Sequence, residues 1–295
     1  MIELRKMSDC TFSEALQAWN KGFEGYYLDM TMEIGPFLKR MVNEDLSPEY
    51  SWIVFSEGSP AGLILSGIRT INGEKRSWNG GTGLAPELRA KGTGRLLVEK
   101  SLETYEENSV DVCFLEAIAD NSPAISLYKK MGYEVVDGLI FFQNRNSLDD
   151  AAFKTITDYR VEHIPVHETA NLDFYEAENS WQTLYQSVKC GKAVIAYDDQ
   201  NEAAGYALFT TQYKDSGELA AITLYQCETK PGRNDEQPIL NSLLSAVFSP
   251  NSEKCVRSTV NTSKKSTSLI DILKRSGFTA AIEQVHMKKT LQPTE

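Results

Sequence analysis

One stretch decides the fold: Leu84-Ala85-Pro86-Glu87-Leu88-Arg89-Ala90-Lys91-Gly92-Thr93-Gly94-Arg95. A strand-like segment ends here, and a helical pattern over residues 92–108 begins with two glycines in its first turn. Backbone amides at a helix start are unpaired and carry partial positive charge, and glycine lets an anion approach the backbone closely. The stretch therefore predicts a site for a phosphate group.

Two familiar phosphate-binding loops do not fit this stretch. A Walker loop is excluded because no Gly-Lys-Ser/Thr follows. A dinucleotide fingerprint is excluded because Leu97 stands where its third glycine belongs. The spacing Arg-x-x-Gly-x-Gly, between a strand and a helix, is the pattern that remains.

The elements around this stretch predict an α+β domain over residues 2–144. Hydrophobic periodicity and turn signals give the order strand, two helices, three antiparallel strands, helix, strand, helix and a closing hairpin around Asp137-Gly138. Thr11-x-x-Glu14 is a capping-box pattern and predicts where the first helix begins. The mostly apolar run 111–119 suits a buried central strand, so the sheet should be mixed but mostly antiparallel, with flanking helices.

The second half of the chain repeats this order with weaker signals. Lys129-Lys130-Met131-Gly132-Tyr133 corresponds to Lys274-Arg275-Ser276-Gly277-Phe278, 145 residues further on. Residues 146–157 are polar and resemble a linker. We therefore expect two similar domains in tandem, at residues 1–146 and 158–295, joined by a linker at 147–157.

The first half resembles the GNAT superfamily of N-acetyltransferases. Arg89-x-x-Gly92-x-Gly94 is similar to the family's Gln/Arg-x-x-Gly-x-Gly/Ala signature, whose backbone amides hold the pyrophosphate of coenzyme A. The resemblance implies acetyl-CoA as cofactor. It also implies that the preceding strand binds the pantetheine arm. The residues carried over are Gly83, Leu84 and Ala85 for the arm, and Arg89, Ala90, Lys91, Gly92, Thr93, Gly94 and Arg95 for the pyrophosphate.

A second motif, Asn121-x-x-Ala124-x-x-Leu127-Tyr128-x-x-x-Gly132-Tyr133, resembles the family's downstream motif. The resemblance implies that Asn121 contacts the pantetheine and that the Tyr128 hydroxyl lies near the thioester sulfur. Amine attack expels a thiolate, and a phenol can give it a proton. Two structural interpretations remain: Tyr128 as an ordinary packed aromatic, and Asn121 as a helix N-cap.

The sequence gives less specific signals for the residues that bind the acceptor amine and take its proton. Glu116 interrupts an apolar strand, where a carboxylate needs a role or a partner; proton acceptor and structural hydrogen-bonding group are equally open. Four aromatic residues are expected around the amine, because ring faces attract cations. They are Phe23, Tyr26, Tyr27 and Trp78, of which Phe23 and Trp78 also fit a packed core.

The second copy lacks the residues of the predicted cofactor site. Gln237, Ile239, Ser266 and Leu273 stand where the first copy has Gly92, Gly94, Asn121 and Tyr128. Glutamine and isoleucine prevent close anion approach, and leucine cannot protonate a thiolate. We expect a degenerate domain that completes the substrate cleft or forms a homodimer surface.

Composition limits the partners. The net charge of −11 argues against nucleic acid and weakly favours a cationic acceptor, although an acidic surface is commoner. The sequence has no apolar run of membrane-spanning length and no signal segment, and its five cysteines are scattered, so we expect a cytoplasmic protein without a metal site. The favoured function is acetylation of a small-molecule primary amine. Alternatives are a protein lysine or N-terminal acetyltransferase and a non-catalytic acyl-CoA sensor.

Overall fold

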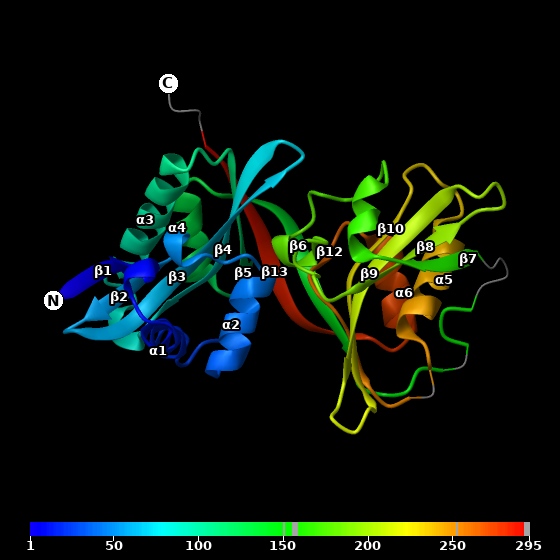
Figure 1. Ribbon diagram of the computed structural model, residues 1–295, viewed down its shortest axis with the longest axis horizontal. Helices are drawn as coiled ribbons and strands as arrows, with labels where there is room; N and C mark the ends of the chain where they lie inside the picture. The colour runs from blue at the N-terminus through cyan, green and yellow to red at the C-terminus, as the bar shows by residue number, and fades with distance from the viewer. Residues whose placement is uncertain (150, 155–158, 252, 292–295) are drawn as a thin grey trace. The chain divides into compact units, whose positions relative to one another are not determined.

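The structure, a computed structural model, describes residues 1–149, 151–154, 159–251 and 253–291 (Figure 1). It contains two compact units. Unit 1 is Met1–Val136 together with Val285–Glu295, and unit 2 is Asp137–Gln284. Each unit has a mixed sheet with flanking helices, which confirms the predicted α+β class.

Unit 1 has the strand order β1-β2-β3-β4-β5-β13. Pairing is antiparallel from β1 to β4 and parallel between β4 and β5. The predicted capping box is present: the Thr11 hydroxyl accepts from the Glu14 amide, and the Glu14 carboxylate accepts from the Thr11 amide. The elements are β1 (Ile2–Lys6), α1 (Phe12–Gly22), α2 (Ile34–Asn43), β2 (Trp52–Ser56), β3 (Ser59–Ile71), β4 (Glu74–Leu84), α3 (Thr93–Glu107), β5 (Val112–Ile118), α4 (Ser122–Lys130) and the part of β13 (Thr279–Thr290) that begins at Val285.

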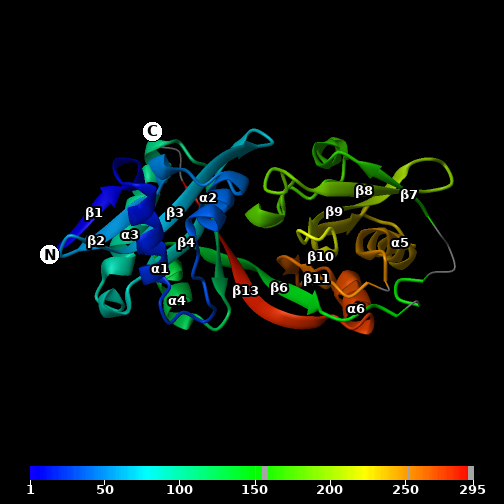
Figure 2. The same ribbon diagram turned by 60° about the horizontal axis from the view of Figure 1, so that its bottom comes forward.

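The helices of unit 1 cover both faces of its sheet (Figure 2). α3 and α4 share a hydrophobic core with alternate residues of β5, namely Cys113, Leu115 and Ala117. α1 covers the opposite face of β4, where the Trp19 ring lies so close to Gly81 that a Cβ there would be 3.0 Å from it. The two faces are therefore separate chemical environments.

Unit 2 has the strand order β6-β11-β10-β9-β8-β7. β10 and β11 are parallel, and the other ladders along this order are antiparallel. One large core fills the space between α5, α6 and the sheet. The elements are β6 (Glu134–Asn144), β7 (Arg160–Ile164), β8 (Lys192–Tyr197), β9 (Ala203–Tyr213), β10 (Leu219–Thr229), α5 (Glu236–Phe248), β11 (Val256–Thr259), β12 (Thr262–Ser263) and α6 (Thr267–Arg275).

The repeat inferred from the sequence is present in the elements. β10 begins and ends 145 residues after β4, and α6 begins and ends 145 residues after α4. Gly132 and Gly277, which follow the two helices, both have positive φ, 86° and 83°. Glycine adopts this conformation without strain, so both copies leave the helix in the same way.

The predicted hairpins at the end of each half are wrong. β6 and β13 are single long strands, and Asp137-Gly138 lies inside β6. The Asp137 carboxylate accepts from the Gly138 amide and the Ser263 hydroxyl, and a Cβ on Gly138 would be 2.7 Å from the Lys264 side chain. Asp137 and Gly138 therefore pack against the residues around β12. They do not form the hairpin turn for which an Asp-Gly pair is usually a signal. In the second half, the repeated order also predicts a helix near residues 181–188, and the structure has only one 3-10 turn there, Trp181–Thr183.

The compact units differ from the predicted domain boundaries. Residues 137–146 belong to unit 2 because β6 pairs there with β11 and β12. Val285–Glu295 belongs to unit 1, where Met287 joins the core of β5 and the Leu291 amide donates to the Asp111 carbonyl. The C-terminal strand thus completes the sheet of the first unit.

Candidate functional site

A fork between two parallel strands is the central feature of unit 1. β4 and β5 pair from Arg76↔Val112 to Asn79↔Leu115, and the ladder stops there. β4 continues to Leu84 and β5 to Ile118, with a register shift in the β3–β4 ladder next to the branching point. The facing edges beyond it form no pairs among the described residues. Such edges suit an extended ligand that carries amide groups.

The predicted pantetheine-binding residues lie along the β4 arm of the fork. Gly83 and Leu84 are within β4 and pair with β3 on its other side. The Ala85 amide donates to the Ala61 carbonyl and is therefore already used within the protein. Gly83 packs against Gly22 and Phe23 of the α1 region, which leaves no space for a side chain.

The loop before α3 presents a row of free amides. Within the described part of the chain, residues 89–92 form a turn, and the backbone amides of residues 90–94 make no well-formed hydrogen bond to a protein acceptor. Ala90 and Gly92 have positive φ, 58° and 86°, on either side of Lys91. Alternation of this kind turns successive amides toward one side and makes an anion-binding concavity. With the positive end of α3 added, the geometry fits a pyrophosphate.

The side chains of this loop do little of that binding themselves. Arg89 donates to the carbonyls of Leu84 (2.8 Å), Gly22 (3.3 Å) and Glu24 (2.5 Å), so its guanidinium ties the loop to the end of α1. Arg95 pairs with Glu99 at 2.6 Å. Thr93 is buried and Lys91 is exposed. Any anion site here depends mainly on the backbone.

Gly94 is the residue of this loop that borders the fork most closely. A Cβ added to it would lie 3.5 Å from a methyl group of Leu84 on β4 and 3.5 Å from one of Leu127 on α4. The missing side chain therefore keeps open the gap between these two elements.

Tyr128 lies on the α3–α4 side of the fork, in the same cluster as Leu115 and Ala117. Its side chain is 7% exposed. Burial raises the pKa of the Tyr128 phenol, and hydrogen bonds with Thr82 and Asn79 of β4 offset only part of that rise. The phenol is therefore protonated at neutral pH and can act as a proton donor.

Asn121 connects α4 with the loop that follows α1, residues 23–31, which is called the aromatic loop because it contains Phe23, Tyr26 and Tyr27. Its Oδ1 accepts from the Ala124 amide at 3.3 Å and caps α4, while its Nδ2 donates to the Tyr26 hydroxyl at 3.5 Å. The Tyr27 hydroxyl donates to the Asp120 carbonyl at 3.3 Å. The aromatic loop thus reaches the end of β5, beside the fork.

The four predicted acceptor-binding aromatics are in different environments. Phe23 is buried, with its ring 4.3 Å from that of Trp19. Trp78 is 2% exposed, and its indole N–H donates to Glu116 Oε2 at 2.6 Å. Tyr26 is half-buried and Tyr27 is 53% exposed. Only the two tyrosines offer a surface to a ligand in this structure.

Glu116 is the first residue of β5 beyond the ladder with β4, and it faces away from Tyr128. Leu115 and Ala117 share the Tyr128 cluster, and strand alternation puts Glu116 on the α1–α2 face. Its second partner is His286 of β13, whose Nδ1 lies 2.9 Å from Glu116 Oε1. The sequence reading missed His286 because no local pattern links two residues 170 positions apart.

Unit 2 has a corresponding fork with different chemistry. β10 and β11 pair from Ala221↔Val256 to Leu224↔Thr259, and β10 continues to Thr229. A cavity of about 390 Å³ lies there, and its charged lining residues are one lysine, Lys265, and five carboxylates: Asp137, Glu176, Glu178, Glu228 and Glu236. Burial, with Glu176 and Glu236 adding repulsion, raises the pKa of Glu228 to about 7. This cavity repels anions.

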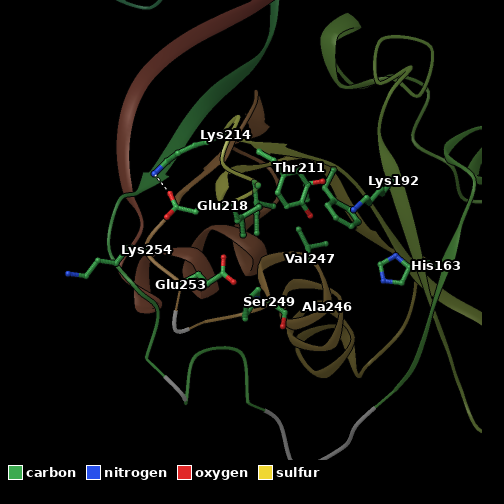
Figure 3. A pocket seen from close by; sticks show the side chains of 16 residues that line it. His163, Lys192, Thr211, Lys214, Glu218, Ala246, Val247, Ser249, Glu253 and Lys254 are labelled. Atoms are coloured by element: carbon green, nitrogen blue, oxygen red, sulfur yellow. Dashed lines mark hydrogen bonds and ion pairs between the residues drawn. The ribbon is translucent and has the colours of Figure 1, made fainter.

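Another cavity of about 650 Å³ lies wholly within unit 2 (Figure 3). Three lysines line it, Lys192, Lys214 and Lys254, and Lys214 pairs with Glu218 at 2.9 Å. It includes none of the predicted site residues. Across the described ranges, no three His, Cys, Asp or Glu side chains are grouped to hold a metal. No described helix is long and apolar enough to span a membrane.

The first half of the chain matches a known protein family. Residues 12–133 match the acetyltransferase (GNAT) family. A stretch of 62 residues is 32% identical to mycothiol acetyltransferase of Corynebacterium jeikeium (strain K411), and it covers 21% of this chain and 18% of that protein.

Two solved structures are similar over the whole chain. A tandem GNAT protein from the clavulanic acid biosynthesis pathway has a TM-score of 0.63 at 14% identity, with 100% of both chains covered. A GCN5-related N-acetyltransferase from Sphaerobacter thermophilus has a TM-score of 0.66 at 16% identity, covering 100% of this chain and 97% of that one. These likenesses confirm the predicted tandem fold.

Proposed function

We propose that this chain, whose residues 12–133 match the acetyltransferase (GNAT) family, transfers the acetyl group of acetyl-CoA to a primary amine of a small molecule. One observation carries the proposal: five consecutive free amides, 90–94, stand at the entrance of a strand fork that has a protonated phenol on one side. Anion binding and proton donation are thus combined in one place.

The residues present fit acetyl-CoA. The amides of 90–94 would hold the pyrophosphate, and the edge of β4 that faces the fork, around Gly83 and Leu84, would hydrogen-bond the amides of the pantetheine arm, with the Leu84 carbonyl also accepting from Arg89. Gly94 leaves room between Leu84 and Leu127 for that arm to pass.

Bound acetyl-CoA supplies an acetyl thioester at the fork. The amine nitrogen bonds to the acyl carbon, and the carbon–sulfur bond breaks. The ammonium form of the acceptor first releases one proton to solvent. As the neutral amine attacks, Tyr128 would give its proton to the sulfur, and Glu116, on the opposite face, would take the second proton that the nitrogen loses. Proton return from Glu116 to Tyr128 through solvent restores both groups, and the products are an N-acetyl amide and a free thiol.

The acceptor is proposed to enter beside Tyr26 and Tyr27. Tyr27 is exposed and both rings adjoin the end of β5, so a cationic amine can lie against a ring face before it loses its proton. The net charge of −11 attracts cationic acceptors over longer distances.

Release of free thiol from acetyl-CoA, measured against a panel of small primary amines and lysine-containing peptides, tests the function. We expect release with at least one small amine and little with peptides. A chain that binds CoA in calorimetry but releases no thiol with any acceptor would be a sensor. Release with peptides alone would reassign the acceptor to protein.

A further inference from the structure

The contact between Glu116 and His286 is built from two distant parts of the sequence. His286 belongs to β13, in the C-terminal segment that completes unit 1. The two side chains are 5% and 6% exposed, and Nδ1 lies 2.9 Å from Oε1. A buried carboxylate is costly unless it is hydrogen-bonded, so this contact is a condition for Glu116 to remain in the strand.

Each oxygen of Glu116 has one ring nitrogen as its partner. Trp78 Nε1–H donates to Oε2 at 2.6 Å, and His286 Nδ1 lies at Oε1. Indole nitrogen is only a donor. With Nδ1 protonated, two rigid donors fix the plane of the carboxylate, while each oxygen keeps a second lone pair to accept a proton.

The ring of His286 is itself held in place. It stacks on Phe114 with centroids 5.3 Å apart and planes 10° from parallel. Its other nitrogen, Nε2, is buried and has no hydrogen-bond partner among the described residues. Leaving a buried polar atom unpaired is costly, and such atoms in native proteins call for an explanation such as a catalytic role. A histidine that only filled the core would not need this arrangement.

We propose that His286 is a positioning residue for Glu116 in the acetyl transfer. Its Nδ1–H holds the carboxylate at the first position of β5 beyond the ladder, on the face opposite Tyr128, where the amine must lose its proton. This inference rests on the function proposed above. It makes the C-terminal strand, which lies outside the segment matched by the family, part of the reaction machinery.

Three substitutions separate positioning from packing. His286→Ala removes the donor, His286→Asn keeps an N–H near the Nδ1 position, and His286→Gln puts its amide near the Nε2 position. We expect kcat for thiol release to fall about 10- to 100-fold in the Ala and Gln variants, as for other misplaced catalytic groups, with KM for acetyl-CoA unchanged. The Asn variant should recover to within about threefold of the wild type because it restores the donor.

A spectroscopic measurement tests the same contact without activity. Nitrogen-15 shifts of His286 in the full chain should show Nδ1 protonated, and Glu116→Gln should change that signal. Calorimetric CoA binding by each variant serves as the folding control.

The outcomes are distinguishable. An active wild type with an equally active Ala variant, or an Asn variant as poor as Ala, overturns the positioning role alone. An unprotonated Nδ1 also overturns it. A wild-type chain that acetylates no acceptor overturns both this inference and the proposed function.

Discussion

The starts of α3 and α5 are the same place in the two copies of the fold, yet they favour opposite charges. Before α3, residues 90–94 have free amides, and the first turn of the helix contains no acidic residue. Before α5, Asp235 is the N-cap and Glu236 begins the helix. Arg233 binds the Asp235 carboxylate through two nitrogens, at 2.8 and 2.7 Å, and holds the pKa of that carboxyl well below its usual range. The start of α3 therefore has no negative charge beside it, whereas the start of α5 has the Asp235 carboxylate nearby, although that side chain makes no capping bond to the helix.

The same contrast continues at the second helix of each copy. Tyr128 of α4 corresponds to Leu273 of α6, which is fully buried. Asn121 caps α4 through its side chain, while Ser266 makes no capping bond to α6. Each unit has a fork between two parallel strands, but the side chains beside the two forks differ in their chemistry. The sheet and helices thus provide a common frame, and we propose that a few residues at the fork decide whether it binds acetyl-CoA.

Removing the Tyr128 hydroxyl should have the largest effect of the substitutions considered. The second copy has no hydroxyl at this position, because Leu273 stands there. We expect Tyr128→Phe to lower kcat about a hundredfold with CoA affinity retained. Tyr133→Phe is the matched control, because its ring lies 6.0 Å from that of Tyr128 in the same core. Steady-state thiol release at several pH values measures both. Full activity of Tyr128→Phe would remove the phenol from the mechanism.

Filling the gap at Gly94 should have the next largest effect. Gly94→Val places methyl groups between Leu84 and Leu127, where the cofactor arm is proposed to run, and should weaken acetyl-CoA binding at least about tenfold, or about 1.4 kcal/mol. Gly94→Ala adds a Cβ in ordinary contact with both leucines, so it should fold normally and lose less affinity. Equal affinities of all three proteins in calorimetry would move the cofactor away from this loop.

The number of acetyl-CoA sites tests the comparison directly. Titration of the whole chain should give a stoichiometry near one, because the unit 2 cavity is lined by five carboxylates that repel a pyrophosphate. The Gly94→Val variant should retain no tight site. A stoichiometry of two, or a tight site that survives the substitution, would show that unit 2 binds CoA by other groups.

The sequence predicted local features well and long-range ones poorly. The helix start at Thr93 and the Thr11 cap depend on neighbouring residues, and the 145-residue repeat consists of such local patterns recurring, so all three are readable in the sequence. Which strands β13 lies beside depends on the hydrophobic core in which Met287 is buried. That core is formed by residues far away in the sequence, so no local pattern indicates it. The domain boundaries and the Glu116–His286 contact were therefore not predictable. Of the two interpretations of Trp78, an aromatic residue beside the amine or a residue of the packed core, its buried environment agrees with the second.

The smallest expected effect concerns Glu228, the most strained carboxylate of the unit 2 cavity. Its pKa in the folded chain is about 7, above the ordinary 4.5, so the folded state holds the proton more tightly than the unfolded state does. Unit 2 should therefore lose stability as the pH rises from about 4.5 to 7, and the full cost should remain above pH 7.

Glu228→Gln keeps an oxygen that can accept from Asn179, now 3.2 Å from Glu228, and cannot ionise. We expect the variant to be more stable than the wild type at pH 8, by about 1 kcal/mol or more, and to match it at pH 4.5. Denaturant unfolding at the two pH values measures this difference, and the pH 4.5 comparison controls for lost packing. A pH-independent difference would mean that neither burial nor the neighbouring carboxylates raise the pKa of Glu228. The contrast between the forks would then depend on Gln237, Ile239 and the acidic start of α5 alone.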